Sequence, residues 1–150
     1  MVTRLFYAMA AMAVLAFAAC EKNEEPAPEP VNGTYIGSLE VSGNGAASFT
    51  DTGIEWVLQE QSDKSYTLYM NQTRFSSMMP VYLDMEVRGM VNQASNGNFL
   101  YETASIIPFY NGTEQTNREM TNVKCEADDT YMTVTFTCMG LNATYRGTAK

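Results

Sequence analysis

The sequence predicts an all-β fold: a single eight-stranded antiparallel up-and-down barrel that follows an N-terminal processing segment and a disordered tether. Apolar and polar residues alternate with period two in short runs, and turn residues such as Gly, Asn and Asp separate these runs. No run shows a convincing 3.6-residue apolar stripe. The chain has 150 residues, and the alternation begins after residue 30, so residues 31–150 have the length of one domain.

Four strands are expected in the first half of this domain: Gly33–Ser42, Gly53–Glu60, Ser65–Asn71 and Val81–Arg88. The last run is the clearest, because apolar residues such as Leu83 and Met85 alternate with charged residues such as Asp84. This pattern is typical of a strand with one dry and one wet face.

Four further strands are expected in the second half: Phe99–Tyr101, Arg118–Cys125, Tyr131–Met139 and Leu141–Thr148. We expect the final strand to pair with the first, because a closed barrel leaves no exposed sheet edge. The interior of an eight-stranded barrel is either filled by side chains or holds one small ligand.

Residues 1–19 have the pattern of a lipoprotein signal peptide. Arg4 is the only charged residue before Cys20, and Leu5–Ala19 is uncharged and mostly apolar. This stretch is shorter than the ~20 residues that span a bilayer, and it ends in small residues, as signal peptides do. Phe17-Ala18-Ala19-Cys20 resembles the lipobox of bacterial lipoproteins, which implies a diacylglyceryl group on Cys20; ordinary cleavage after Ala18 is the alternative.

Residues 20–30 are expected to form an acidic, Pro-rich tether. Glu21–Pro30 holds four Glu and three of the five prolines of the chain, a composition that favours extended, solvated backbone. Acyl chains on Cys20 would attach the domain to a membrane, at about 0.8 kcal/mol per buried CH₂. Glu21, Glu24 and Glu25 resemble the acidic residues that follow the cysteine in surface-exported lipoproteins of Bacteroidetes. We therefore expect the outer membrane or the cell surface as the location.

Composition excludes several classes of function. The net charge of −8 argues against a nucleic-acid partner. The chain has no histidine, which removes His-based catalytic dyads and His-ligated zinc. Asp84 and Glu86 lie on a wet face, and Glu126, Asp128 and Asp129 lack the spacing of a calcium loop. The sequence therefore predicts a protein that is not an enzyme and that has no cofactor and no metal.

The chain resembles the calycin-like lipoproteins of Bacteroidetes. The resemblance rests on Gly33-Thr34-Tyr35-Ile36-Gly37, the Trp56 strand and Tyr145-Arg146-Gly147-Thr148, and it covers residues 31–150. It implies a lipocalin-like barrel but no chemistry, because the family has no established activity. The wider calycin group mostly binds small apolar molecules inside the barrel and some members inhibit proteases, which is an analogy at the level of the fold. In lipocalins a basic residue of the last strand caps an aromatic residue of the first, so the resemblance pairs Arg146 with Tyr35.

Large apolar residues on the expected inner faces are the candidates for a ligand pocket: Tyr35, Trp56, Leu58, Tyr66, Met70, Met85, Phe99, Tyr101 and Phe136. Such side chains describe either a small-molecule pocket or a packed core. Two functions follow. The first is a non-enzymatic binder of a small apolar molecule; the alternative is a structural or interaction module, or an inhibitor, of a cell-surface complex, with a filled barrel and a surface protein as its partner.

Two apolar loops and a cysteine pair remain as candidates. Phe75–Pro80 and Ile106–Tyr110 are each either a docking surface or a plug over an open barrel end. Cys125 and Cys138 lie on neighbouring expected strands, where they form a disulfide or remain two small buried thiols. A turn centred near Asp128 would place Cys125 opposite Tyr131.

Overall fold

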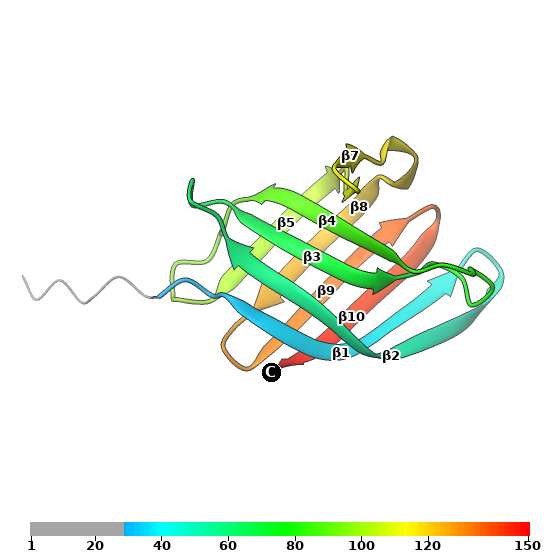
Figure 1. Ribbon diagram of the computed structural model, residues 1–150, viewed down its shortest axis with the longest axis horizontal. Helices are drawn as coiled ribbons and strands as arrows, with labels where there is room; N and C mark the ends of the chain where they lie inside the picture. Colours follow the sequence, from blue (N-terminus) through cyan, green and yellow to red (C-terminus); the bar gives the residue numbers. More distant parts are fainter. Residues whose placement is uncertain (1–28) are drawn as a thin grey trace, which may run out of the picture.

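The protein is an antiparallel sheet of ten strands curled into a half-barrel (Figure 1). The computed structural model describes residues 29–150. The expected signal peptide, lipidated Cys20 and most of the expected tether lie outside the described residues. The strand order is β5-β8-β9-β10-β1-β2-β3-β4-β6-β7.

Eight strands are long, and each overlaps one of the eight runs expected from the sequence. Their bounds are β1 Gly33–Gly43, β2 Ala46–Glu60, β3 Tyr66–Thr73, β4 Leu83–Met90, β5 Phe99–Ile106, β8 Met120–Ala127, β9 Tyr131–Cys138 and β10 Leu141–Ala149. Two short strands, β6 Phe109–Tyr110 and β7 Thr113–Glu114, and a 3₁₀ turn at Thr116–Arg118 complete the described chain. Between residues 29 and 150 no helix has the length and apolar character to cross a membrane.

Strand β2 begins at Ala46 and not at Gly53, the start that the sequence predicts. Gly43-Asn44-Gly45 does not end the sheet, because all three residues have positive φ and turn the chain directly from β1 into β2. Gly53 lies inside β2 with a φ of 69°, next to a shift of register between β1 and β2. A turn and a bulge therefore occupy the two places where glycine indicates a break in the strand.

The final strand pairs with the first, as predicted, but the barrel does not close between β4 and β5. The predicted closed eight-stranded barrel is therefore wrong in this respect. One reason is that β6 occupies the free edge of β4, where Met85 pairs with Tyr110 and Glu86 with Phe109. The sheet thus ends in two edges instead of one seam.

Side-chain amides occupy part of the second edge, which is β5. The backbone N–H of Gln93 donates to the carbonyl of Leu100 over 2.7 Å. The side-chain amide of Gln93 bonds both the carbonyl and the N–H of Glu102, at 3.0 and 3.2 Å. Asn92 Oδ1 accepts the N–H of Leu100 at 3.0 Å. These amides satisfy backbone groups that a neighbouring strand would otherwise pair.

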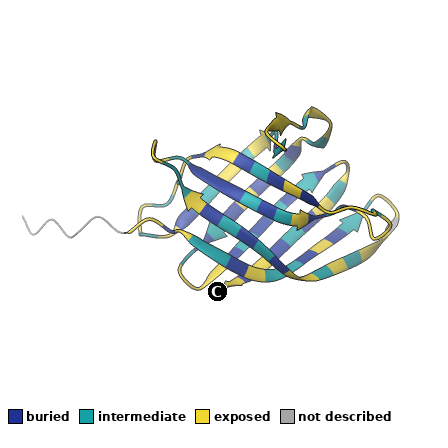
Figure 2. Cartoon of the chain, in the orientation of Figure 1, coloured by how far each residue is buried: buried dark blue, intermediate teal, exposed yellow. Residues whose placement is uncertain are grey.

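Buried and exposed residues alternate along the strands, which gives the banded pattern of Figure 2. Trp56 of β2 and Tyr145 of β10 are fully buried, and their rings stack with centroids 4.1 Å apart. The hydroxyl of Tyr145 lies 2.8 Å from the carbonyl oxygen of Tyr35 and 2.9 Å from that of Ile54. Tyr145 thereby connects three strands at the centre of the core.

Strands β1 and β10 approach closely because glycines face each other. Gly37 pairs with Gly147, and a Cβ on Gly37 would lie 1.8 Å from the carbonyl oxygen of Arg146. A Cβ on Gly147 would lie 2.6 Å from the Tyr145 hydroxyl. No side chain fits at Gly37 unless the two backbones separate.

We predict that Gly37→Ala destabilises the protein by about 3 kcal/mol or more, because the added methyl group forces β10 away from β1. The free energy of unfolding in urea measures the effect. Gly45→Ala is the control: unlike Gly37, Gly45 has a positive φ, but it has open space around its Cα, so the substitution costs about 1 kcal/mol of backbone strain without a steric clash. Equal losses in the two variants would contradict the role of the close approach.

The two cysteines of the domain are free thiols buried in the core. Cys125 pairs with Val134 and Cys138 with Met120, so the register keeps them apart along the strands. The candidate disulfide is therefore not formed. The β8–β9 turn is centred after Asp128, with Ala127 opposite Met132, which moves Cys125 away from the predicted pairing with Tyr131.

Burial also suppresses ionisation in the core. Desolvation, aided by nearby Glu126, raises the pKa of Cys125 to about 12. Desolvation raises the pKa of Cys138 to about 11, against the opposing effect of Arg118. Desolvation likewise raises the pKa values of Tyr35 and Tyr145 to about 12. In each case the neutral form is favoured by the fold.

We predict alkaline destabilisation between pH 9 and about 12. As pH rises, these groups keep their protons in the folded state after the unfolded chain has lost them. Their contribution to the free energy of unfolding is therefore fully present below pH 9 and is lost as pH rises through the folded-state pKa values. Urea unfolding at a series of pH values measures the slope. Maleimide labelling of Cys125 and Cys138 should increase together with unfolding. A free energy of unfolding that is constant across this range would contradict the prediction.

Candidate functional site

The residues predicted to line an interior pocket lie in the core, as their inward orientation requires. Eight of them are buried, and Tyr101 is partly buried against the same cluster. They contact one another and their neighbours: the rings of Tyr66 and Phe99 lie 4.7 Å apart, and that of Phe136 lies 6.3 Å from Phe75. These side chains occupy the interior of the half-barrel, and their role in binding a ligand stays a prediction.

The capping pair implied by the family resemblance is not formed. Tyr35 is buried, and its hydroxyl donates to the backbone carbonyl of Asp128 over 2.5 Å. Arg146 is exposed on the outer face of β10. The stack on Trp56 is made by Tyr145, one residue earlier in the same strand, because alternation turns Tyr145 inward and Arg146 outward.

A pocket of about 430 Å³ opens at one end of the half-barrel. We call this end the rim; in Figure 1 it lies opposite the start of β1. The β1–β2 hairpin, the β3–β4 loop and the start of β10 form the pocket. Its lining residues are Val41, Ser42, Gly43, Asn44, Ala47, Phe49, Phe75, Ser76, Ser77, Met78 and Leu141. The volume falls within the range of about 300–1,000 Å³ that is typical of small-molecule sites.

The β3–β4 loop both covers the core and presents an apolar side chain to solvent. Phe75 is buried, and its N–H donates to the sulfur of Met79, which packs against the core. Met78 between them is 90% exposed, and Val81 and Tyr82 are also exposed. The loop is therefore a plug at Phe75 and Met79 and an accessible apolar surface at Met78.

Arg74 fixes this loop to β2. Its Nε and Nη2 atoms each donate to a carboxylate oxygen of Asp51 over 2.6 Å, and Nη1 donates to the carbonyl of Ser77 over 3.1 Å. The guanidinium also lies 5.4 Å from the ring centre of Phe49 and 5.1 Å from that of Tyr82. The hydrogen bond with Asp51 raises the pKa of Arg74. The pocket is thus bordered by a fixed loop.

The rim pocket has no ionisable lining residue. Residues 41–50, 75–83 and 130–145 contain no Asp, Glu, Lys or Arg, although the chain carries a net charge of −8. Sequence reasoning singled out the Phe75–Pro80 loop but missed Phe49, Leu141 and the β1–β2 hairpin. The three charge-free segments were the signal that could have found them.

Met139 is a second exposed methionine at this end of the sheet. It lies in the two-residue β9–β10 turn with a φ of 52°, followed by Gly140 at 75°, and it is 45% exposed. Two positive φ values define a type I′ hairpin, which strongly prefers Asn-Gly. Methionine is strained in this conformation and gains little burial from it.

We predict that Met139→Asn stabilises the protein by about 1 kcal/mol, because asparagine tolerates the left-handed conformation better. The urea midpoint should rise with an unchanged slope. Gly140→Ala is the matched control and should lower the midpoint, since it introduces the same strain at the next residue. A lower midpoint for Met139→Asn would show that the methionine side chain contributes packing.

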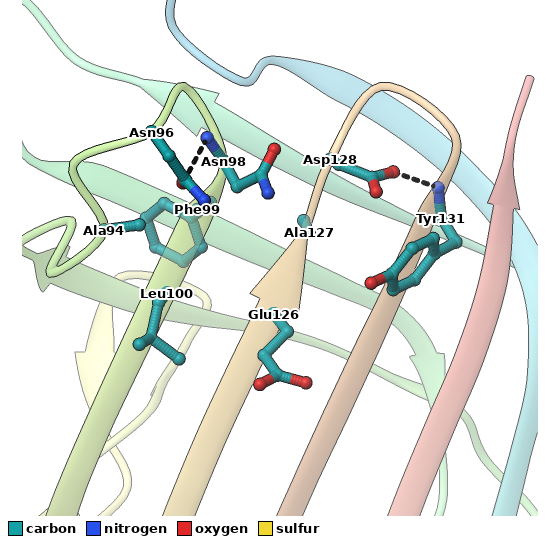
Figure 3. Close-up of a pocket in the computed structure, with 9 residues that line it drawn as sticks. All are labelled: Ala94, Asn96, Asn98, Phe99, Leu100, Glu126, Ala127, Asp128 and Tyr131. Carbon is teal, nitrogen blue, oxygen red and sulfur yellow. Dashed lines mark hydrogen bonds between the residues drawn. The ribbon is translucent and has the colours of Figure 1, made fainter.

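A second pocket, of about 210 Å³, lies at the opposite end, between the β4–β5 and β8–β9 connections (Figure 3). Two of its polar side chains have partners within the turns: the Asp128 carboxylate accepts the N–H groups of Thr130 and Tyr131, and Asn96 accepts that of Asn98. Among residues 29–150 no three His, Cys, Asp or Glu side chains are grouped to hold a metal ion. The rim pocket is the better candidate for an apolar ligand.

The second apolar segment of the sequence, Ile106–Tyr110, continues the wall of the half-barrel. Its Phe109 and Tyr110 form β6 on the edge of β4. The Arg88 guanidinium lies 4.3 Å from the ring centre of Phe109, and Tyr110 packs against the core. The side chains of this segment are therefore buried or partly buried against the sheet, whereas Met78 is exposed.

Fold and site together define an antiparallel half-barrel with a packed interior and an uncharged apolar pocket at one end. Comparisons of the chain with protein-family models, with curated proteins and with solved structures found no match.

Proposed function

We propose that this protein is an exported, lipid-anchored, non-enzymatic domain that holds a small apolar molecule in the rim pocket. The observation that carries the proposal is the pocket of about 430 Å³ lined by Phe49, Phe75, Met78 and Leu141. The core residues that the sequence also offers for this role pack against one another. A ligand at the rim needs no rearrangement of the interior.

The position of the rim agrees with an anchor at Cys20. The described chain enters β1 at the end opposite the rim, so a tether that precedes residue 29 joins the domain there (Figure 1). An attached domain would therefore turn its rim away from the membrane, toward molecules outside it. The resemblance to calycin-like lipoproteins, and with it the outer membrane or cell surface as location, belongs to the same proposal.

A structural or interaction module is the second candidate. The packed interior and the exposed Met78, Val81 and Tyr82 favour it, because a surface protein could contact the same rim without a small ligand. The first candidate predicts that the purified protein carries a small apolar molecule, whereas the second predicts that it carries none.

The test uses the full chain in phospholipid nanodiscs and a photoreactive decanol probe. We predict that Met78→Ser lowers labelling of the rim peptides by about tenfold, because the ligand loses a methionine contact. Val91→Ser is the matched control: Val91 is 65% exposed at the opposite end, and its loss should leave labelling unchanged.

Absence of rim labelling in the unsubstituted chain would refute the small-molecule function. Protein extracted from its native membrane that repeatedly carries only anchor lipid would support the same conclusion, and both results would favour the interaction module.

A further inference from the structure

The charge distribution around the rim pocket restricts the kind of apolar molecule that it can hold. The lining consists of apolar side chains together with the hydroxyl and amide groups of Ser42, Asn44, Ser76 and Ser77. No lysine or arginine lines the pocket. A carboxylate or phosphate head group placed at its mouth would lose hydration without gaining a cationic partner.

Arg74 is a cation at the border of the pocket, since it bonds Ser77 and lies against Phe49. Both carboxylate oxygens of Asp51 already accept hydrogen bonds from its guanidinium. The pair is partly buried, with 20% of the Arg74 side chain and 12% of the Asp51 side chain exposed. The positive charge of Arg74 is therefore neutralised before any ligand arrives.

The remainder of the protein adds to this discrimination. The net charge of −8 produces a field that disfavours the approach of an anion. By contrast, Asn44, Ser76 and Ser77 line the pocket and are exposed, which places them at its mouth, and their amide and hydroxyl groups can bond an uncharged head group such as an alcohol or an ester.

We infer that the rim pocket selects an uncharged amphiphile, a single apolar chain that ends in a hydroxyl or ester group, over the anionic amphiphile of the same chain. This inference rests on the proposed function, because it specifies the ligand of the same pocket. The apolar chain contacts Phe49, Met78 and Leu141, and the head group lies among the serines at the mouth. Methionine adapts to chains of differing shape, so selection depends on the head group.

Two photoreactive probes with the same chain test the inference, one a decanol and the other a decanoate. Each is equilibrated by dialysis to the same free concentration with the full chain in phosphatidylcholine nanodiscs, and labelling of peptides from residues 41–49 and 75–78 is quantified by mass spectrometry. We expect the decanol probe to label them about tenfold more than the decanoate probe. Equal labelling, or stronger labelling by decanoate, would overturn the inference and leave rim binding intact. Labelling by neither probe would refute the proposed function itself.

A charge placed at the mouth provides the reciprocal test. Ser77 is exposed, and only its backbone carbonyl bonds Arg74, so Ser77→Lys adds a cation without removing the Arg74–Asp51 pair. We expect Ser77→Lys to raise decanoate labelling by about tenfold, whereas Ser77→Gln, of similar length and no charge, leaves it unchanged. Circular dichroism confirms that both variants are folded. An unchanged preference in folded Ser77→Lys would contradict the inference, and the comparison of probes on the unsubstituted chain does not depend on this variant.

Discussion

The structure depends on the contact between the first and last strands. Gly37 allows β1 and β10 to approach within a distance that a Cβ at this position would not tolerate, and Gly147 leaves room for the side chain of Tyr145, whose hydroxyl reaches carbonyl groups of β1 and β2. The ring of Tyr145 stacks on Trp56, which orders the centre of the core. Because these partners are distant in sequence, this contact forms only when the two ends of the domain meet.

This contact shows what sequence reasoning can and cannot supply. Alternation predicted the eight long strands and the inward side of residues such as Trp56 and Met85, because burial on one face imposes period two. The argument from exposed sheet edges predicted that the last strand meets the first. The family resemblance, by contrast, wrongly paired Arg146 with Tyr35, because a resemblance transfers a motif without its register; Tyr145, one residue earlier, is the side chain that reaches Trp56.

The barrel does not close between β4 and β5 for a local reason, which the apolar alternation of the sequence does not indicate. The amides of Asn92 and Gln93 bond the edge of β5, and the two-residue strand β6 bonds the edge of β4. Both edges thus gain partners from short segments that lack any alternation of their own. Side-chain amides reproduce the spacing of backbone groups, so a sheet can end here without a neighbouring strand. A pattern of apolar residues predicts which face of a strand is buried, but it does not predict what pairs with the edge of that strand.

The rim differs from the rest of the surface in what its residues contribute to stability. Elsewhere, exposed positions carry the charges of a chain whose net charge is −8. At the rim, Met78 is almost fully exposed and Met139 holds a strained turn, so neither side chain is explained by folding. Arg74, in contrast, uses all of its nitrogen atoms to hold the loop that presents Met78. An accessible apolar surface on a rigidly fixed loop suits binding, since little conformational entropy is lost when a ligand arrives. The same fixation explains why an uncharged ligand fits: the one cation at the pocket is engaged in fixing the loop.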